Sequence, residues 1–185
     1  MNNSVEQAVA VLRMGGVIAY PTEYCFGLGC DPRNESAVQR ILTIKQRDVA
    51  QGLILVAADM NQVADYATLQ GLDRLDQIKA SWPGPNTWVL PTTTQTPTWI
   101  SGQHCSVAMR VTAHPLVKSL CQRFEGAVVS TSANRHGEPS LMSASKLASN
   151  MGDEVDFILD GELSESPTER SASNLYHAIT GEVLR

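Results

Sequence analysis

The run Ser130-Thr131-Ser132-Ala133-Asn134 carries four small hydroxyl or amide side chains within five residues. It follows an apolar stretch at 127–129 that is typical of a buried strand, and it precedes a loop-like stretch at 135–139. Neither strand nor helix propensity explains so many short Ser, Thr and Asn side chains in one segment. These side chains could close a turn on their own backbone. They could also bind a ligand at the carboxyl end of a strand, where open α/β sheets hold their ligands.

Three cations are candidates for binding phosphate or carboxylate groups: Lys45, Arg47 and Arg110. Arg110 lies in the apolar stretch 107–111. A charge that points inward there needs a partner or a ligand, whereas one that points outward is simply solvated. Lys45 and Arg47 lie at or just past the end of a predicted helix, where basic side chains also satisfy the last carbonyls. The nucleotide fingerprints G-x-G-x-x-G and G-x-x-x-x-G-K-S/T are absent.

Metal-binding and hydrolytic patterns are weak. The four cysteines form no C-x-x-C pair, so we expect free thiols in a reducing compartment. Zinc at Cys25, Cys30 and His104-Cys105 would lack the usual two-plus-two ligand spacing. Glu23 and Asp31 could contact Mg²⁺, but one or two loop carboxylates do not define a magnesium site. Neither G-x-S-x-G nor a Ser-His-Asp spacing is present, so a hydrolytic triad is not expected.

The totals are those of a single globular domain over 1–185. The chain has 185 residues, of which 43% are hydrophobic and 18% charged, and this length supports a sizeable core. It has no apolar run of about 18 residues and no signal peptide at its start, so we expect no membrane association and a cytoplasmic location. The net charge of −5 disfavours a protein that coats nucleic acid, although it is compatible with a local basic patch.

The candidate residues need elements to position them, and the sequence predicts alternating helices and strands. Helices are predicted at 4–14 with a Ser4/Gln7 capping box, at 34–45, after Asp59, around 72–78, at 115–124 and at 143–151. Strands are predicted at 17–20, 53–57, 87–90, 107–111, before Ser130 and at 155–159, with a terminal hairpin over 175–185. Residues 21–32 are expected to form a loop too rich in aromatic, glycine and polar residues to be a mere connector. The pattern predicts an α/β domain with a mixed sheet.

Taken in order, these motifs resemble the YrdC-type threonylcarbamoyl-AMP synthases, in particular their short bacterial form. The matching segments are Tyr20-Pro21-Thr22-Glu23, Phe26-Gly27-Leu28-Gly29-Cys30-Asp31-Pro32, Lys45-Gln46-Arg47 and the run 130–134. The K-x-R and S-x-N pairs that mark the family stand as Lys45/Arg47 and Ser132/Asn134. Each motif is short, but the ordered set spans essentially the whole chain and is specific.

The resemblance implies a twisted mixed parallel/antiparallel sheet flanked by helices, YrdC-like, with a concave ligand-binding face. It implies a nucleotidyltransferase that joins L-threonine, bicarbonate and ATP, with Mg²⁺ accompanying ATP, into threonylcarbamoyl-adenylate and pyrophosphate. This reaction is the first step of the threonylcarbamoyladenosine modification of tRNA. A downstream transferase complex would then pass the threonylcarbamoyl group to tRNA. Direct contact of this chain with tRNA stays open.

The residue types suit the implied chemistry. Lys45 and Arg47, together with Mg²⁺, would offset the repulsion between anions and support the departing pyrophosphate, so they are catalytic and ATP-binding candidates. Ser132 and Asn134 have the same two assignments. The resemblance also predicts that Ser140 binds ATP and that Thr22, Arg110 and Ser130 bind threonine, with Arg110 contacting a carboxylate through two donors. No strong general base is needed once the carbamate of threonine has formed.

Some positions depart from the family pattern. Asp48 follows the K-x-R pair where proline is usual, which places an anion beside the proposed phosphate site. Tyr176 and His177 stand where related short forms tend to carry arginine and aspartate. Ser171-Ala172-Ser173 matches the family's nucleotide-binding segment only in part, so contacts of this segment and of Arg170 with a nucleotide stay open.

Two other functions remain as alternatives at this stage. A non-catalytic module that binds double-stranded RNA or tRNA would use the same cations, although the net charge of −5 and the lack of interleaved aromatic and basic residues disfavour RNA as the sole ligand. Carbamoyl-adenylate chemistry, as in the related domain of the hydrogenase maturation protein HypF, normally belongs to a much longer chain.

Overall fold

The computed structural model describes residues 2–135, 137–163 and 174–184. In this part of the chain, strands pair into one eight-stranded sheet with the order β7-β1-β2-β6-β3-β5-β4-β8. The strands are β1 (Ile18–Pro21), β2 (Phe26–Gly29), β3 (Ile54–Ala57), β4 (Asn86–Pro91), β5 (Ser106–Val111), β6 (Val128–Ser132), β7 (Phe157–Ile158) and β8 (Asn174–His177). The β1–β7, β3–β5 and β4–β8 pairs are parallel and the others antiparallel. The predicted mixed α/β sheet is confirmed.

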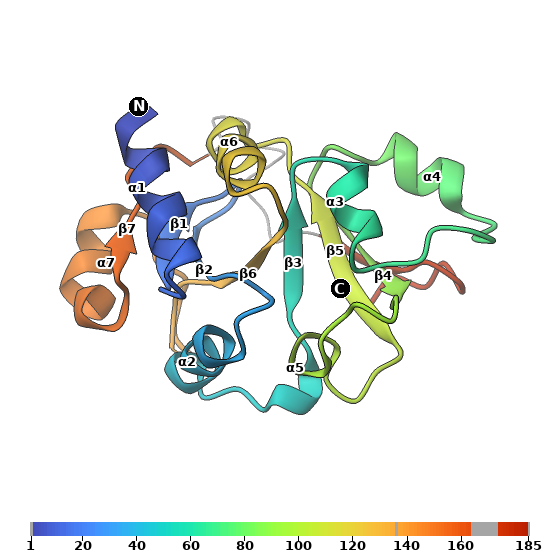
Figure 1. The fold of residues 1–185 in the computed structure, drawn as a ribbon, viewed down its shortest axis with the longest axis horizontal. Coiled ribbons are helices and arrows are strands. Elements are labelled where there is room, and N and C mark those ends of the chain that lie inside the picture. Colours follow the sequence, from blue (N-terminus) through green and yellow to red (C-terminus); the bar gives the residue numbers. More distant parts are fainter. Residues whose placement is uncertain (1, 136, 164–173, 185) are drawn as a thin grey trace.

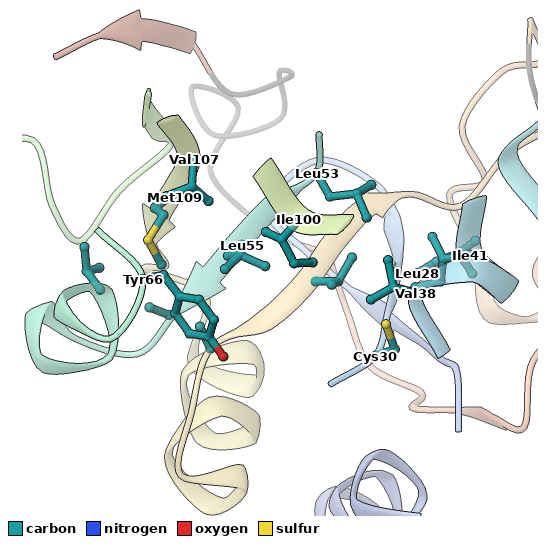
Figure 2. Close-up of a cluster of buried hydrophobic side chains, with 14 of the residues drawn as sticks. Leu28, Cys30, Val38, Ile41, Leu53, Leu55, Tyr66, Ile100, Val107 and Met109 are labelled. Atoms are coloured by element: carbon teal, nitrogen blue, oxygen red, sulfur yellow. The ribbon is translucent and has the colours of Figure 1, made fainter. Parts of the chain in front are cut away.

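Helices flank the sheet (Figure 1). In the described residues they are α1 (Asn2–Arg13), α2 (Glu35–Lys45), α3 (Met60–Ala64), α4 (Leu75–Ala80), α5 (Thr98–Ser101), α6 (Pro115–Phe124) and α7 (Ala144–Met151), with short 3₁₀ turns η1 (Val49–Gln51) and η2 (Gly152–Glu154). Helices α1 and α6 lie side by side and pack on the apolar side chains of β1, β3 and β6. A larger cluster, part of which Figure 2 shows, packs α2, α3 and α5 against the sheet.

Strand register explains where a ligand site can form. Side chains that are paired across strands share a face of the sheet. Val56 is paired with Arg110, Ile54 with Ser130, and Gly27 with Ser132. Arg110, Ser130 and Ser132 therefore face the same side as Val56, which packs with α1 and α6. Polar and small side chains replace apolar ones on this face beyond those two helices.

Most of the predicted elements are confirmed, and their caps explain why. The Asn34 side chain accepts a hydrogen bond from the Ala37 amide at the start of α2, and Asp59 and Ser143 cap α3 and α7 in the same way. At the C-terminal end the chain turns back as predicted: Tyr176 forms an antiparallel bridge with Val183, and the His177 and Leu184 amides donate to the Glu182 and Leu175 carbonyls. Strand β8 also pairs with β4, which the sequence did not predict.

Several details of the prediction are wrong, among them the helix after Asp59, which was expected to carry Val63, Tyr66 and Leu69 but ends at Ala64 as α3. Helix α1 begins at Asn2, so Ser4 lies within the helix and cannot form a capping box. The supposed loop at 21–32 contains β2, whose two glycines have little strand propensity of their own. The strand predicted before Ser130 continues to Ser132 as β6. Thr131 and Ser132 are part of the ladder because they pair with β2.

Gly29 provides a test of how β2 is held. A Cβ at this position would lie 2.7 Å from Cε1 of Tyr20 and 2.7 Å from the Val129 carbonyl oxygen. We expect Gly29→Ala to lower the free energy of unfolding by about 1–3 kcal/mol, because the Tyr20 ring and the backbone must both move. Chemical denaturation measures this change. Gly152→Ala is the matched control, since Gly152 has a φ of −56° and no atom within 4 Å of the added carbon. A loss of stability no larger than in the control would contradict this packing.

Candidate functional site

A central hollow of about 330 Å³ lies on the sheet face described above. Its walls are Thr22, Tyr24, Cys25, Gly27, Arg47, Ile54, Arg110, Ser130, Thr131, Ser132 and Ser140. A second hollow of about 230 Å³, here called the lysine hollow, adjoins it and is lined by Lys45, Gln46, Arg47, Gln51, Thr131, Ser132, Asn134, Arg135 and Gly137. All eight site residues predicted from the sequence line one or both hollows. The structure therefore brings them together, although it does not by itself assign their roles.

Lys45 joins the K-x-R segment to the S-x-N segment. It is only 8% exposed, and its Nζ donates hydrogen bonds to the carbonyl oxygens of Ser132 and Asn134, both at 2.7 Å, and to Oδ1 of Asn134. Oγ of Ser132 donates to the same Oδ1 at 2.6 Å. Lys45 is thus not a solvated helix end, because it ties the end of α2 to the end of β6.

Burial and the neighbouring Arg47 lower the pKa of Lys45 to about 8. At neutral pH most of the molecules still carry the ammonium. A bound anion would stabilise that charged form further.

A left-handed turn places Arg47. Gln46 ends α2 with a φ of 48°, and its amide donates to the carbonyls of Leu42 and Thr43. This conformation costs a non-glycine residue roughly 1 kcal/mol, and such strain is concentrated at functional sites. After the turn, Nη2 of Arg47 donates to the Gly52 carbonyl at 2.8 Å. The Asp48 carboxylate accepts from the Ala50 amide at 2.9 Å and caps η1, so this anion is occupied by the backbone.

Arg110 points inward, which settles the two alternatives left open by the sequence. The residue is 9% exposed, and its Nη2 lies 3.2 Å from Oε2 of Glu23. Oγ1 of Thr112 donates to the other carboxylate oxygen of Glu23 at 2.7 Å. Burial alone would raise the pKa of Glu23, but Arg110 and Thr112 lower it more, so its pKa lies below the usual range.

The structure does not support Glu23 and Asp31 as a magnesium site. Glu23 is 2% exposed and already paired. Asp31 forms an ion pair with Arg33, with its Oδ1 3.0 Å from Nε. No group of three or more His, Cys, Asp and Glu side chains suited to a metal occurs within the described ranges. The described cysteines are free thiols, as expected.

The hydroxyl groups of the central hollow are partly engaged. Oγ1 of Thr22 donates to the Cys25 carbonyl at 2.7 Å, which leaves it an acceptor for a ligand. Ser130 is buried beside Tyr20. The Ser140 hydroxyl hydrogen bonds the Cys25 thiol, whose pKa is raised by burial. The thiol is therefore a neutral wall of the hollow at physiological pH.

A third cavity, the apolar hollow, was not predicted. It has about 370 Å³ and is lined by Arg47, Gln51, Gly52, Leu53, Ile54, Val89, Ile100, Ser101, His104, Ser106, Val107, Ala108, Leu175, His177 and Leu184. It shares Arg47 and Ile54 with the central hollow. These residues come from elements far apart in the sequence, so no motif signals their assembly.

The structure accounts for the departure at Tyr176 and His177, but not for the one at 170–173. The Tyr176 ring stacks on Trp88, with centroids 4.9 Å apart, and His177 lines the apolar hollow. Nδ1 of His177 accepts a hydrogen bond from the Thr180 amide at 3.2 Å. Arg170 and Ser171-Ala172-Ser173 lie outside the described residues.

Within the described chain, no helix has both the length and the apolar character needed to cross a bilayer.

Sequence comparisons place this chain in a known family. The model of the Sua5/YciO/YrdC family, which carries the description "Telomere recombination", matches residues 10–185. A threonylcarbamoyl-AMP synthase of Coxiella burnetii (strain RSA 493 / Nine Mile phase I) is 48% identical over 182 residues, which cover 98% of this chain and 96% of the relative. A protein of the same name from Stenotrophomonas maltophilia (strain K279a) is 46% identical over 186 residues, covering 98% and 97%.

Solved structures agree with this result. The crystal structure of P. abyssi Sua5 complexed with L-threonine has a TM-score of 0.88 and 31% identity, and the match covers 98% of this chain and 53% of that one. The chain thus spans about half the length of that protein. E. coli YciO has a TM-score of 0.81 at 24% identity, with 100% of this chain and 91% of that one covered, and this likeness concerns the fold alone.

The titration of Lys45 gives a test of the lysine hollow. Lys45 is cationic below its pKa of about 8 and loses its charge as the pH rises through that value, whereas the phosphates of ATP are already ionised. We expect the dissociation constant for ATP, measured calorimetrically, to rise between about pH 7 and pH 9. Lys45→Met should bind ATP more weakly and without this pH dependence. A variant that keeps the wild-type pH dependence would show that another group titrates.

Proposed function

The chain belongs to the Sua5/YciO/YrdC family, and we propose that it is a threonylcarbamoyl-AMP synthase, which converts L-threonine, bicarbonate and ATP into threonylcarbamoyl-adenylate and pyrophosphate. The observation that carries this proposal is the convergence of Lys45, Arg47 and Arg110 with small hydroxyl groups around adjoining hollows. Curated relatives with this name are matched over nearly their whole length. As an enzyme that transfers an adenylyl group from ATP, the protein would be a nucleotidyltransferase.

The cations of the site suit a reaction in which a carboxylate attacks a polyanionic nucleotide, because they offset the repulsion between the two anions. The carboxylate of N-carboxy-threonine attacks the α-phosphorus of ATP, the bond to the β-phosphate oxygen breaks, and pyrophosphate leaves. Arg47 lines all three hollows and can contact charge on both sides of the breaking bond. Lys45, Ser132 and Asn134 supply an electropositive, polar wall for the phosphates. Such fixed charges lower the barrier without a general base.

The substrates can be assigned to the hollows by chemistry. The threonine carboxylate suits Arg110, because a guanidinium binds carboxylates through two parallel hydrogen bonds. Thr22 and Ser130 line the same central hollow and suit the threonine hydroxyl, while Ser140 suits a phosphate or the ribose. The apolar hollow, next to Arg47, suits the adenine base.

Magnesium would arrive with the nucleotide. The described residues do not provide a carboxylate cluster for it, and Mg²⁺ is commonly held in large part by substrate phosphates. We therefore assign no step of the reaction to a protein-bound metal. In a cell, the product would pass to a transferase complex that modifies tRNA, and we place the protein in the cytoplasm.

An RNA-binding module is less well supported. Lys45 and Arg110 are 8% and 9% exposed, and cations that track an RNA backbone need to be accessible along a groove. Direct contact with tRNA at other surfaces is compatible with the proposed reaction. Structures of HypF resemble this chain at 15% and 16% identity, which shows a shared fold and gives no support for carbamoyl-adenylate chemistry.

Pyrophosphate release tests the proposed reaction. With purified protein, Mg²⁺ and ATP, we expect release only when L-threonine and bicarbonate are both present, because the attacking carboxylate comes from their adduct. Omission of either substrate is the control. Release that is independent of threonine, or no release together with measurable binding of tRNA, would contradict the proposal.

The S-x-N segment can be tested through ATP affinity. We expect Ser132→Ala and Asn134→Ala each to weaken ATP binding by about 1–3 kcal/mol, the usual effect of losing a buried contact to a charged group. Ser149→Ala, which changes an exposed hydroxyl on α7, is the matched control. Calorimetry that gave unchanged affinities for both variants would leave Ser132 and Asn134 a structural role only.

A further inference from the structure

A buried ion pair lies behind the central hollow. Nη2 of Arg110 is 3.2 Å from Oε2 of Glu23. The Glu23 residue is 2% exposed and Arg110 9% exposed. Of the two, only Arg110 lines the hollow. The arginine therefore lies between the buried carboxylate and the space available to a ligand.

The turn between β1 and β2 fixes Glu23 in this position. The Thr22 amide donates to the Cys25 carbonyl at 3.0 Å, and Oγ1 of Thr22 donates to the same carbonyl. Between these residues Glu23 points into the protein, while the adjacent Tyr24 is 36% exposed. A backbone closed in this way gives the carboxylate little freedom to move.

Each carboxylate oxygen of Glu23 has a partner within the protein, Oε1 through a hydrogen bond and Oε2 through an ion pair without a hydrogen bond. Oε1 accepts the hydroxyl hydrogen of Thr112 at 2.7 Å, and Oε2 faces Arg110. The pKa of Glu23 lies below the usual range, so the group takes up no proton near neutral pH. At 2% exposure it also reaches no substrate. Glu23 can act on a ligand only through Arg110.

The arginine keeps donors for a ligand. Its ion pair with Glu23 uses Nη2, and the side chain lines the central hollow, which leaves terminal N–H groups of the guanidinium for a ligand there. A guanidinium is planar and rigid, so a contact that holds one of its nitrogens sets the direction of all its N–H groups. Without an anion behind it, a buried guanidinium would turn toward other acceptors or toward water.

We infer that Glu23 is a positioning residue that holds the Arg110 guanidinium so that its remaining donors face the carboxylate of the amino-acid substrate. The inference rests on the proposed function and assigns a role to a residue that never touches the substrate. It predicts that a change at Glu23 affects threonine binding far more than nucleotide binding or the rate at saturation.

Glu23→Gln tests the inference, because it removes the charge with almost no change of shape. We expect the KM and the dissociation constant for L-threonine to rise at least about tenfold, as for a misaligned charge-assisted contact. The KM for ATP and the kcat at saturating threonine should stay within about twofold of wild type. Glu35→Gln, at the opposite end of α2 from Lys45, is the control and should change neither constant. Equal threonine affinity in Glu23→Gln and wild type would overturn the inference.

Glu23→Gln leaves a buried arginine unpaired, which is destabilising. A second variant therefore tests the inference if Glu23→Gln does not fold. Thr112→Val keeps the ion pair but removes the hydrogen bond that holds the carboxylate, together with the one that the His114 amide donates to the same hydroxyl. We expect a smaller, severalfold rise in the KM for threonine with an unchanged KM for ATP. No rise, or an equal rise for both substrates, would contradict the inference. Wild-type protein that binds no threonine would instead contradict the proposed function.

Discussion

The burial of the Lys45 ammonium is the constraint on which the site depends. An ammonium withdrawn from water needs oxygen acceptors, and Lys45 finds them in the carbonyls of Ser132 and Asn134 and in the Asn134 side chain. These groups lie more than eighty positions further along the chain. Their contact fixes the end of α2 against the end of β6. The left-handed Gln46 then directs Arg47 to the junction of the three hollows.

The charged side chains of the site are buried to different depths. Glu23 is the most deeply buried charged group of the site, and Arg110 lies between it and the central hollow. Arg47 and Lys45 line the adjoining lysine hollow. Glu23, Lys45, Arg47 and Arg110 together carry a net positive charge, within a chain whose net charge is −5. Anionic substrates are therefore attracted by the site and not by the protein as a whole.

Contacts between residues close in the sequence made many of the helices and strands predictable. Asn34, Asp59 and Ser143 predict helix starts because a cap is a contact between near neighbours, and the unbroken apolar run at 53–57 predicts β3. Strand β2 was missed because its glycines are selected by the close approach of the Tyr20 ring, a tertiary contact. The eight residues predicted to form the site line the hollows, and they were singled out by residue type and by family motifs; neither signal decided whether Arg110 points inward. No sequence motif predicted the apolar hollow, since elements far apart in the sequence supply its walls.

The most direct test of the central claim is to identify the product. Mass spectrometry of a reaction with ATP, L-threonine and isotopically labelled bicarbonate should reveal an adenylate that contains threonine and the bicarbonate label, because the carbamate carboxylate is the group that attacks the α-phosphorus. An adenylate of threonine without the label would show that the amino acid itself is activated. The absence of any threonine-containing adenylate would contradict the account as a whole.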